Sequence, residues 1–164
     1  MADSLAGLVL AAGSGTRLRP LTRHRTKAMC PVGDRPLVDW AIDRVAPLVG
    51  EVAVNARYDV QRLAAHVEHR AHVSDERSYP EELGTGGAVG ALREWLDGRA
   101  VLVVNGDTWT DVELSPLLDG WDGERVRVLV HGAPGTGLEV LPGVVGSLVP
   151  AGDVPRLPAT PLGL

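Results

Sequence analysis

The chain has 164 residues and a formal net charge of −5, with 45% apolar and 23% charged residues. This length is that of about one ordinary domain, and the composition excludes a disordered or fibrous chain. The mild acidity argues against a general nucleic-acid binder, because affinity for phosphate backbones needs clustered positive charge. We expect neither a signal peptide nor a membrane span, since the first ten residues lack a basic start and no apolar run is long enough.

Predicted strands alternate with predicted helices along the chain. We expect strands at 7–12, 51–55, 71–74, 100–105 and 125–131, and helices at 36–49, 60–69, 88–96 and, as a short turn, 114–118. Residues 13–35 and 78–87 are expected to be loops. The alternation predicts an α/β domain with a doubly wound, mostly parallel sheet, in which ligands bind at the carboxyl ends of the strands. Gly13, Asn55 and Asp107 fall at such ends.

The C-terminal part differs in composition, with 7 Gly and 6 Pro in the 33 residues from Gly132 onward. Apolar residues between 140 and 149 predict one or two edge strands, and 150–164 is expected to be a loop. We therefore divide the chain into an α/β domain at 1–131 and a Gly/Pro-rich part at 132–164.

The scarce residue types point to particular positions. The single cysteine, Cys30, excludes an internal disulfide and a multi-thiolate metal site, and it fits the reducing cytoplasm. Of 16 basic residues, only Lys27 is a lysine. It ends the most basic stretch of the chain, which begins at Arg17 and lies in a region without acidic residues between Asp3 and Asp34. A chance cluster is the alternative to an anion-binding stretch.

A glycine-rich loop, Gly13-Ser14-Gly15-Thr16-Arg17, follows the first predicted strand. Glycines let backbone N–H groups approach an anion, and a guanidinium matches phosphate oxygens. The third glycine of a dinucleotide-binding fingerprint would fall at position 18, which is Leu18. The Gly-Lys-Ser/Thr of the Walker pattern is absent from the sequence. Spacing alone leaves a phosphate loop and a ligand-free tight turn as alternatives, and the basic stretch favours the phosphate loop.

Three segments in order resemble sugar-1-phosphate nucleotidylyltransferases, also called NDP-sugar pyrophosphorylases. LAAGSGTRLRPLT at 10–22 and KAMCPVGDRPL at 27–37 resemble the family signature, with Thr26 where proline is usual. LGTGGAV at 83–89 is similar to the family's base-binding loop, and VVNGDTWTD at 103–111 to its metal-binding strand end. The W-T-D tail looks closest to the N-acetylmuramate-1-phosphate uridylyltransferase and mannose-1-phosphate guanylyltransferase branches.

The resemblance implies a Rossmann-like, GT-A-like nucleotidyltransferase fold and one reaction. A sugar-1-phosphate oxygen attacks the α-phosphorus of a nucleoside triphosphate, and pyrophosphate leaves. It implies Arg17 as the catalytic contact to pyrophosphate and Lys27 as the cation at the α-phosphate, where a compact ammonium suits a crowded centre. Asp107 is implied as the ligand of Mg²⁺, the expected cofactor. The implied nucleotide-binding residues are Leu10, Ala11, Ala12, Gly13, Ser14, Gly15, Thr16, Arg17, Glu76, Gly84, Thr85, Gly86 and Asn105.

Each of these roles has a structural alternative. Asp107 could be a turn or cap residue, and Thr85 could cap a helix that begins at Gly86. Asn55 could support the sugar side or a turn, and Asn105 could fix the loop geometry. Asp111 is expected at the surface, the histidines at 66, 69 and 72 in solvent, Trp40 and Trp95 in the core, and Cys30 as a small buried hydrophobe.

Members of the family continue several dozen residues beyond this chain, so the resemblance implies a truncated C-terminal part in which 132–164 begins an incomplete sugar-acceptor region. The family's second metal-binding aspartate and its E-K-P element are not recognisable. The expected partners are a nucleoside triphosphate and a sugar-1-phosphate, without nucleic acid or membrane, and a homo-oligomer is left open. Two alternatives are a non-catalytic nucleotide-binding homologue that serves as a regulatory or assembly subunit, and transfer to a non-sugar phosphate acceptor.

Overall fold

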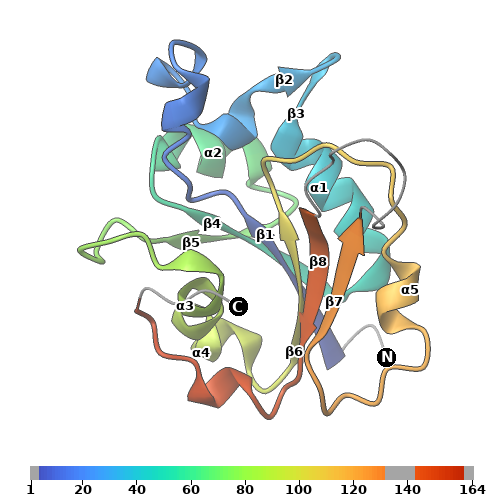
Figure 1. Ribbon diagram of the computed structural model, residues 1–164. Coiled ribbons are helices and arrows are strands. Elements are labelled where there is room, and N and C mark those ends of the chain that lie inside the picture. Colours follow the sequence, from blue (N-terminus) through green and yellow to red (C-terminus); the bar gives the residue numbers. More distant parts are fainter. Residues whose placement is uncertain (1–3, 132–142, 161–164) are drawn as a thin grey trace.

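A six-stranded sheet of order β5-β4-β1-β6-β8-β7 forms the centre of the molecule (Figure 1). The computed structural model describes residues 4–131 and 143–160. The neighbours β5, β4, β1 and β6 are parallel, whereas β8 is antiparallel to both β6 and β7. The strands are β1 (Leu5–Leu10), β4 (Glu51–Ala56), β5 (His72–Asp75), β6 (Ala100–Asn105), β7 (Arg127–His131) and β8 (Gly143–Val149), with a separate hairpin of β2 (Pro31–Val32) and β3 (Arg35–Pro36).

Helices cover both faces of this sheet. On one face lie α1 (Leu37–Val45), α2 (Val60–Val67) and α5 (Ser115–Leu118); on the other lie α3 (Gly84–Ala91), α4 (Arg93–Leu96) and the 3₁₀ turn η6 (Val154–Arg156). Four further 3₁₀ turns are η2 (Thr16–Leu18), η3 (Leu21–Arg23), η4 (Lys27–Met29) and η5 (Ala46–Leu48). The predicted doubly wound, mostly parallel α/β fold is therefore confirmed. Within the described residues, no helix is long and apolar enough to cross a membrane.

Strand β1 is buried on both faces, as its apolar sequence predicts for a central parallel strand. Leu5 and Val9 belong to the core under α1, and Leu8 belongs to the core under α3. A Cβ at Gly7 would lie 2.4 Å from Cγ1 of Val45 in α1. The glycine therefore lets helix α1 approach the sheet closely.

Several predicted boundaries were wrong. The first strand spans Leu5–Leu10 and not 7–12, and the expected loop at 13–35 contains the turns η2, η3 and η4 and part of the β2–β3 hairpin. The helix expected from residue 88 begins four residues earlier, at Gly84, because tertiary packing overrides the low helix propensity of its glycines. Leu83 is the N-cap, so the alternative of Thr85 as the cap is also wrong. Residues 150–164 were expected to form a loop, but they include η6; 161–164 lie outside the described residues.

Strand β8 was expected at an edge of the sheet but lies inside it, between β6 and β7. Leu148 and Val149 are buried, one in each core, which explains why this segment prefers an interior position. Residues 140–142 of the predicted edge region lie outside the described residues. The division of the chain at residue 131 stays a prediction, and β8 shares one sheet with strands from 1–131.

The segment 157–160 lies directly on helix α3. A Cβ at Gly87 would lie 2.1 Å from the carbonyl oxygen of Thr160, and one at Gly90 would lie 2.5 Å from that of Pro158. Nη2 of Arg93 also donates a hydrogen bond to the carbonyl of Leu157, at 2.6 Å. The glycines of this helix thus form the surface on which the backbone of 157–160 packs.

We expect Gly87→Ala to lower the free energy of unfolding by about 1–3 kcal/mol, because the new methyl group would overlap a backbone oxygen. This loss outweighs the helix propensity that alanine adds, about 1 kcal/mol. Urea unfolding measures the change. Gly152→Ala is the matched control, since nothing lies within 4 Å of its new Cβ. A Gly87→Ala variant at least as stable as the parent protein would contradict the packing argument.

Candidate active site

A cavity of about 180 Å³ opens at the carboxyl ends of β1, β4 and β6. Doubly wound sheets bind their ligands at this edge. Strands β1 and β6 end here with Leu10 and Asn105, and β4 contributes Asn55, one residue before its end. The lining residues are Leu10, Ala12, Gly13, Asn55, Glu76, Glu82, Leu83, Gly84, Thr85, Asn105 and Asp107. Seven of the residues predicted to bind nucleotide and the predicted metal ligand thus lie around one cavity.

The catalytic candidates from two distant segments meet at this edge. Nζ of Lys27 donates a hydrogen bond to Oδ2 of Asp107 at 2.9 Å, across 80 positions of sequence. The two side chains are 29% and 36% exposed, so both charges remain accessible. Oδ1 of Asp107 accepts a longer hydrogen bond from the Thr108 hydroxyl, at 3.3 Å.

Gly106 determines the path of the chain into this pair. Its N–H donates to the carbonyl of Leu10 at 2.8 Å. A Cβ at Gly106 would lie 2.6 Å from Cγ1 of Val9 and 2.9 Å from the carbonyl oxygen of Leu10. Because Gly106 has no side chain, the backbone just before Asp107 can pack against the end of β1. The predicted phosphate loop follows this end of β1.

The predicted phosphate loop is held against the turn that carries Lys27. Gly15 has a φ of +59°, and its carbonyl accepts a 2.7 Å hydrogen bond from the Thr22 hydroxyl. A Cβ at Gly15 would lie 3.2 Å from Cβ of Lys27. Gly13, Ser14 and Thr16 are exposed and available to a ligand. The loop thus lies beside both Lys27 and the cavity.

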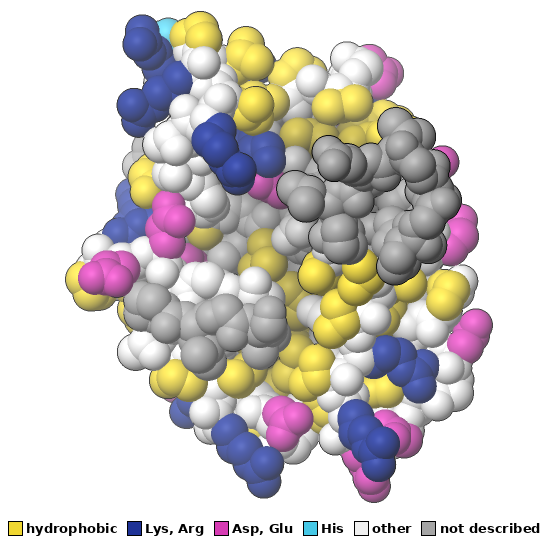
Figure 2. Space-filling view, in the orientation of Figure 1, with side chains coloured by type: hydrophobic (Ala, Val, Ile, Leu, Met, Phe, Trp, Pro, Cys, Tyr) yellow, Lys and Arg dark blue, Asp and Glu magenta, His cyan; other side chains and the backbone are white. Residues whose placement is uncertain are grey.

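Exposed arginines extend the positive charge beyond this loop. Arg17, Arg19, Arg23 and Arg25 are exposed, and none pairs with an acidic side chain among the described residues. Figure 2 shows dark-blue side chains gathered over the part of the molecule that carries η2 and η3 in Figure 1. An adjacent cavity of about 520 Å³ includes Ser14 and Thr16 in its lining. This face offers an anionic ligand several unpaired cations.

Glu76 is the most deeply buried acid of the site, with 1% of its surface exposed. Its Oε1 accepts a 2.8 Å hydrogen bond from Nδ2 of Asn55, and its Oε2 has no hydrogen-bond partner. Burial raises the pKa of Glu76, while the Asn55 hydrogen bond and the charge of Arg57 lower it and the charge of Glu82 raises it. One buried acceptor at the cavity is therefore left for a ligand or a water.

Asn55 joins two walls of the cavity. Its Oδ1 accepts the N–H of Ala11 at 2.7 Å while its amide nitrogen binds Glu76. Asn55 thus forms a buried bridge from β1 to the residue after β5, and its role on the sugar side stays a prediction. The N–H of Ala11 is occupied by this bond and is therefore not free to donate to a nucleotide.

Six of the residues predicted to bind nucleotide do not line the first cavity, and two of them, Ser14 and Thr16, line the adjacent cavity of about 520 Å³. Within the described part of the chain, Ala11, Gly15, Arg17 and Gly86 are not among the lining residues of the first cavity. Gly86 is buried in α3, one residue after Thr85, and Arg17 is exposed in η2. These four positions have no direct contact with the cavity in the structure.

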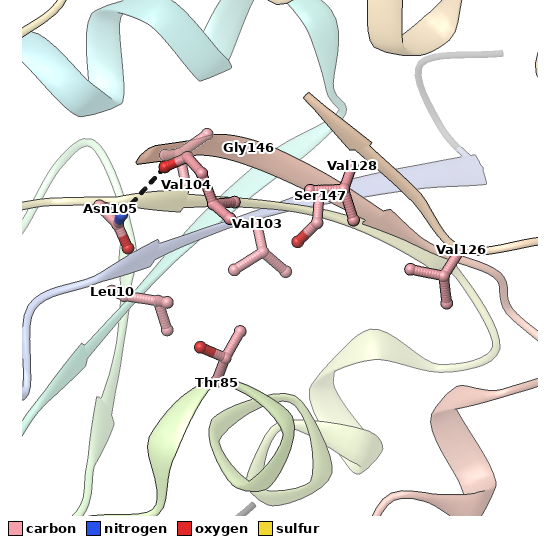
Figure 3. Close-up of a pocket in the computed structure, with 10 residues that line it drawn as sticks. Leu10, Thr85, Val103, Val104, Asn105, Val126, Val128, Gly146 and Ser147 are labelled. Carbon is pink, nitrogen blue, oxygen red and sulfur yellow. Dashed lines mark hydrogen bonds between the residues drawn. The ribbon is translucent and has the colours of Figure 1, made fainter. Parts of the chain in front are cut away.

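A second cavity, of about 240 Å³, adjoins the first and shares Leu10, Thr85 and Asn105 with it (Figure 3). Nδ2 of Asn105 makes a 3.4 Å hydrogen bond to the carbonyl of Val144, so the end of β6 is tied to β8. Figure 3 shows Val126, Val128 and Ser147 along the far side of this cavity, opposite Thr85 of α3. Asn105 thus stands at the boundary between the two cavities.

We expect Glu76→Gln to raise the free energy of unfolding at neutral pH, because it removes the cost of burying a carboxylate. Because the folded-state pKa is raised, the ionised form destabilises the fold as pH rises above the ordinary glutamate pKa. The gain should shrink as pH falls below that value. Urea unfolding across pH measures it, with the exposed Glu94→Gln as control. A gain that is unchanged at low pH would contradict the assignment.

Several residues outside the site differ from expectation. Nε2 of His66 lies 3.0 Å from both carboxylate oxygens of Asp39, so this histidine is paired and not simply solvated. Trp40 is half-buried and belongs to neither core, so its prediction as a core residue was wrong, whereas Trp95 is half-buried but packs against the core under α3. Their rings lie under the guanidinium groups of Arg35 and Arg99, and Trp95 also stacks on His72. Cys30 is buried and Asp111 is exposed, as predicted.

Three residues of the site were missed. Glu82 and Leu83 line the cavity, and Arg57 binds the segment that precedes them. Leu83 begins the segment that resembles the base-binding loop but was not named as a site residue, and Glu82 stands just before it, where no charge pattern marks a site. The signal for Arg57 was present, because it follows a buried strand two residues after Asn55.

Comparison with known proteins places this chain in a family. A family model described as nucleotidyl transferase matches residues 6–133. The chain belongs to the nucleotidyl transferase family. It is 36% identical over 134 residues to N-acetylmuramate alpha-1-phosphate uridylyltransferase of Caulobacter vibrioides, over 74% of this chain and 54% of that protein. It is 31% identical over 128 residues to mannose-1-phosphate guanylyltransferase of Mycobacterium tuberculosis, over 76% of this chain and 36% of that protein.

Structural comparison gives the same fold. HddC from Yersinia pseudotuberculosis, solved in complex with GMP-PN, aligns with a TM-score of 0.69 at 16% identity, over 96% of this chain and 82% of that chain. The predicted nucleotidyltransferase fold is thus confirmed. The chain spans about half the length of the uridylyltransferase and about a third of the guanylyltransferase that it matches.

Proposed function

We propose that this member of the nucleotidyl transferase family joins a nucleoside triphosphate and a sugar-1-phosphate to give an NDP-sugar and pyrophosphate. The observation that carries the proposal is the 2.9 Å contact between Lys27 and Asp107 at the mouth of the cavity. It brings together the end of the basic stretch and the end of the central strand. Relatives named as uridylyl- and guanylyltransferases of sugar-1-phosphates support the same reaction class.

The chemistry is a single displacement at phosphorus. An oxygen of the sugar phosphate forms a bond to the α-phosphorus, and the bond from that phosphorus to the bridging oxygen breaks, so pyrophosphate leaves with the electron pair. Positioning and charge neutralisation dominate such a reaction. The loop 13–16 would hold phosphate oxygens with its backbone, Arg17 would bind pyrophosphate, and Lys27 would neutralise the α-phosphate.

The residues of the site fit a magnesium ion held together with the nucleotide. The described residues contain no group of three or more His, Cys, Asp or Glu side chains that could hold a metal alone. Mg²⁺ is commonly bound by one or two carboxylates, with substrate phosphates and waters completing its shell. Asp107 supplies such a carboxylate at the cavity. When bound there, the ion would withdraw negative charge from the phosphates.

The remaining features of the proposal follow from composition. A reducing compartment suits the buried free Cys30, so we place the activity in the cytoplasm. The anionic partners are small molecules that meet one local basic face, and nucleic acid and membranes are not among the partners proposed. A homo-oligomer is compatible with this reaction.

The test measures pyrophosphate release from each nucleoside triphosphate with a panel of sugar-1-phosphates and Mg²⁺. We expect release only when both substrates are present. Nucleotide binding without turnover would overturn the proposal in favour of a regulatory or assembly subunit. Turnover only with a non-sugar phosphate, such as phosphocholine, would instead identify a different acceptor. A chain that binds no nucleotide would refute all three functions.

A further inference from the structure

Arg57 binds four backbone carbonyls of one loop. Its Nη1 donates to the carbonyl oxygens of Glu76, Tyr79 and Glu81, at 2.8, 2.9 and 3.1 Å. Its Nη2 donates to that of Pro80, at 3.1 Å. Arg57 directly follows β4, so a rigid central strand holds its backbone. The guanidinium is therefore an anchor around which the segment 76–81 folds.

That segment connects two parts of one wall of the candidate cavity. It begins at Glu76 and leads into Glu82 and Leu83, and the side chains at all three positions contribute to the lining. The neighbour of Arg57 acts on the same wall, because the Tyr58 hydroxyl donates to Oε1 of Glu82 at 3.1 Å. The residues that follow β4 thus hold both ends of the wall.

We propose that Arg57 is a positioning residue for the nucleoside, which it serves by fixing the segment 76–81 and with it Glu76 and Glu82. The inference rests on the proposed function in that the cavity binds a nucleotide. It goes beyond that function because it assigns substrate affinity to a residue outside the lining of the cavity. Arg57 acts through the loop and does not touch the reacting atoms.

Arginine suits this role for a geometric reason. Its planar guanidinium carries five N–H donors in a fixed fork, whereas the lysine ammonium is a compact charge with three rotating donors. Four converging carbonyls match the fork. Without the guanidinium, the loop carbonyls would bind water instead. Nucleotide binding would then have to order the loop, which costs binding free energy.

Charge supports the same role. Burial raises the pKa of Glu76, and the nearby Arg57 cation opposes that rise. The other groups that act on this carboxyl are Asn55, whose hydrogen bond also lowers its pKa, and Glu82, whose charge raises it. Removing the cation would therefore favour the protonated form of the buried acid at the cavity.

The catalytic pair is held by other elements. Lys27 lies in η4 and Asp107 follows β6, and the hydrogen bonds of Arg57 go to neither element. A change at Arg57 should therefore alter the binding of nucleotide more than the chemical step. Comparing kcat with KM for the nucleoside triphosphate separates these effects.

The test compares Arg57→Gln with Arg127→Gln. Arg127 is a matched control, because it also donates to three backbone carbonyls, those of Leu117, Asp119 and Gly120, at 3.1, 2.7 and 3.1 Å. It lies in β7 and holds the end of α5, away from the cavity. Both variants should unfold at a lower temperature than the parent protein. Only Arg57→Gln should raise KM for the nucleoside triphosphate, by roughly tenfold, with kcat and KM for the sugar phosphate nearly unchanged.

Two further measurements distinguish positioning from general loss of structure. Arg57→Lys keeps the charge and some donors, so it should recover part of the nucleotide affinity. We also expect the ionised carboxylate of Glu76, whose Oε2 has no partner, to accept a hydrogen bond from the nucleoside, so that binding weakens at low pH. In Arg57→Gln this weakening should begin at a higher pH than in the parent, because the pKa of Glu76 rises further. Equal effects of the Arg57 and Arg127 variants on nucleotide KM would overturn the inference.

Failure of this inference can be told apart from failure of the proposed function. If the parent protein binds nucleotide without turnover, the proposed reaction is refuted, and calorimetric Kd values of the same variants replace KM. A roughly tenfold weaker Kd in Arg57→Gln alone then supports the positioning role. A parent protein that binds no nucleotide overturns both proposals.

Discussion

Replacing Lys27 with alanine is expected to slow pyrophosphate release by about a hundredfold to a thousandfold, the range seen when a group that stabilises transition-state charge is removed. Lys27 lies 2.9 Å from Asp107 at the cavity and is the chain's sole lysine among 16 basic residues. Under the proposed function, its ammonium neutralises the negative charge that moves from the α-phosphate to pyrophosphate. Single-turnover assays of pyrophosphate release measure the effect.

Lys27→Arg should be nearly as inactive, although it keeps the charge. A planar guanidinium is wider than an ammonium and prefers to bind two oxygens side by side, which a crowded phosphorus centre does not offer in that plane. An arginine variant with activity close to that of the parent protein would refute this account of Lys27.

Loss of activity in these variants should not come from unfolding. The Lys27–Asp107 pair is about one third exposed, and such pairs stabilise proteins by roughly 0–1 kcal/mol. Arg156→Ala breaks the exposed pair of Arg156 with Asp153 and is the control. Both variants should unfold at nearly the parent temperature, and only the Lys27 variant should lose turnover.

Asp107→Asn is expected to reduce turnover by about a hundredfold and to abolish most of the effect of Mg²⁺ on nucleotide affinity. The change keeps the shape of the side chain but removes the negative charge that a hard cation prefers. Because the described residues offer no preformed metal cluster, we expect Mg²⁺ alone to bind weakly and to bind more tightly once a nucleotide is present.

Calorimetry measures this coupling as the ratio of nucleotide Kd with and without Mg²⁺, for the parent protein and the variant. Asp111→Asn is the matched control, because Asp111 lies four residues further along the same segment and is exposed. It should keep the full response to Mg²⁺. An Asp107→Asn variant with the same response as the parent would show that the metal is held elsewhere.

The sequence predicted the fold well where burial alone determines structure. The runs at 51–55 and 100–105 are apolar on both faces, and their strands form where expected, as β4 and β6. It failed at 84–87, where four residues of low helix propensity or small size begin a helix. The packing of 157–160 on Gly87 and Gly90 involves residues about 70 positions away, which local patterns do not report.

The same limit applies to the site. Strand-end position placed Gly13, Asn105 and Asp107 at one edge, because parallel strands bring their carboxyl ends together. The hydrogen-bond partners of the buried polar groups could not be predicted from the sequence. Asn55 binds both Ala11 and Glu76, and these pairings depend on the neighbour order of β1, β4 and β5.

The interior position of β8 has a consequence for the order in which the chain can fold during synthesis. Strands β5, β4, β1 and β6 can pair as soon as they leave the ribosome, but the free edge of β6 receives its partner only from 143–149. Strand β7 is made earlier and still has to wait, since it pairs with β8 alone. A nascent chain without β8 therefore carries an open strand edge with unpaired N–H and C=O groups, the kind of surface on which growing chains associate. When β8 pairs with the sheet, its two edges form hydrogen bonds with β6 and with β7, so the open edge of β6 is covered and β7 joins the sheet.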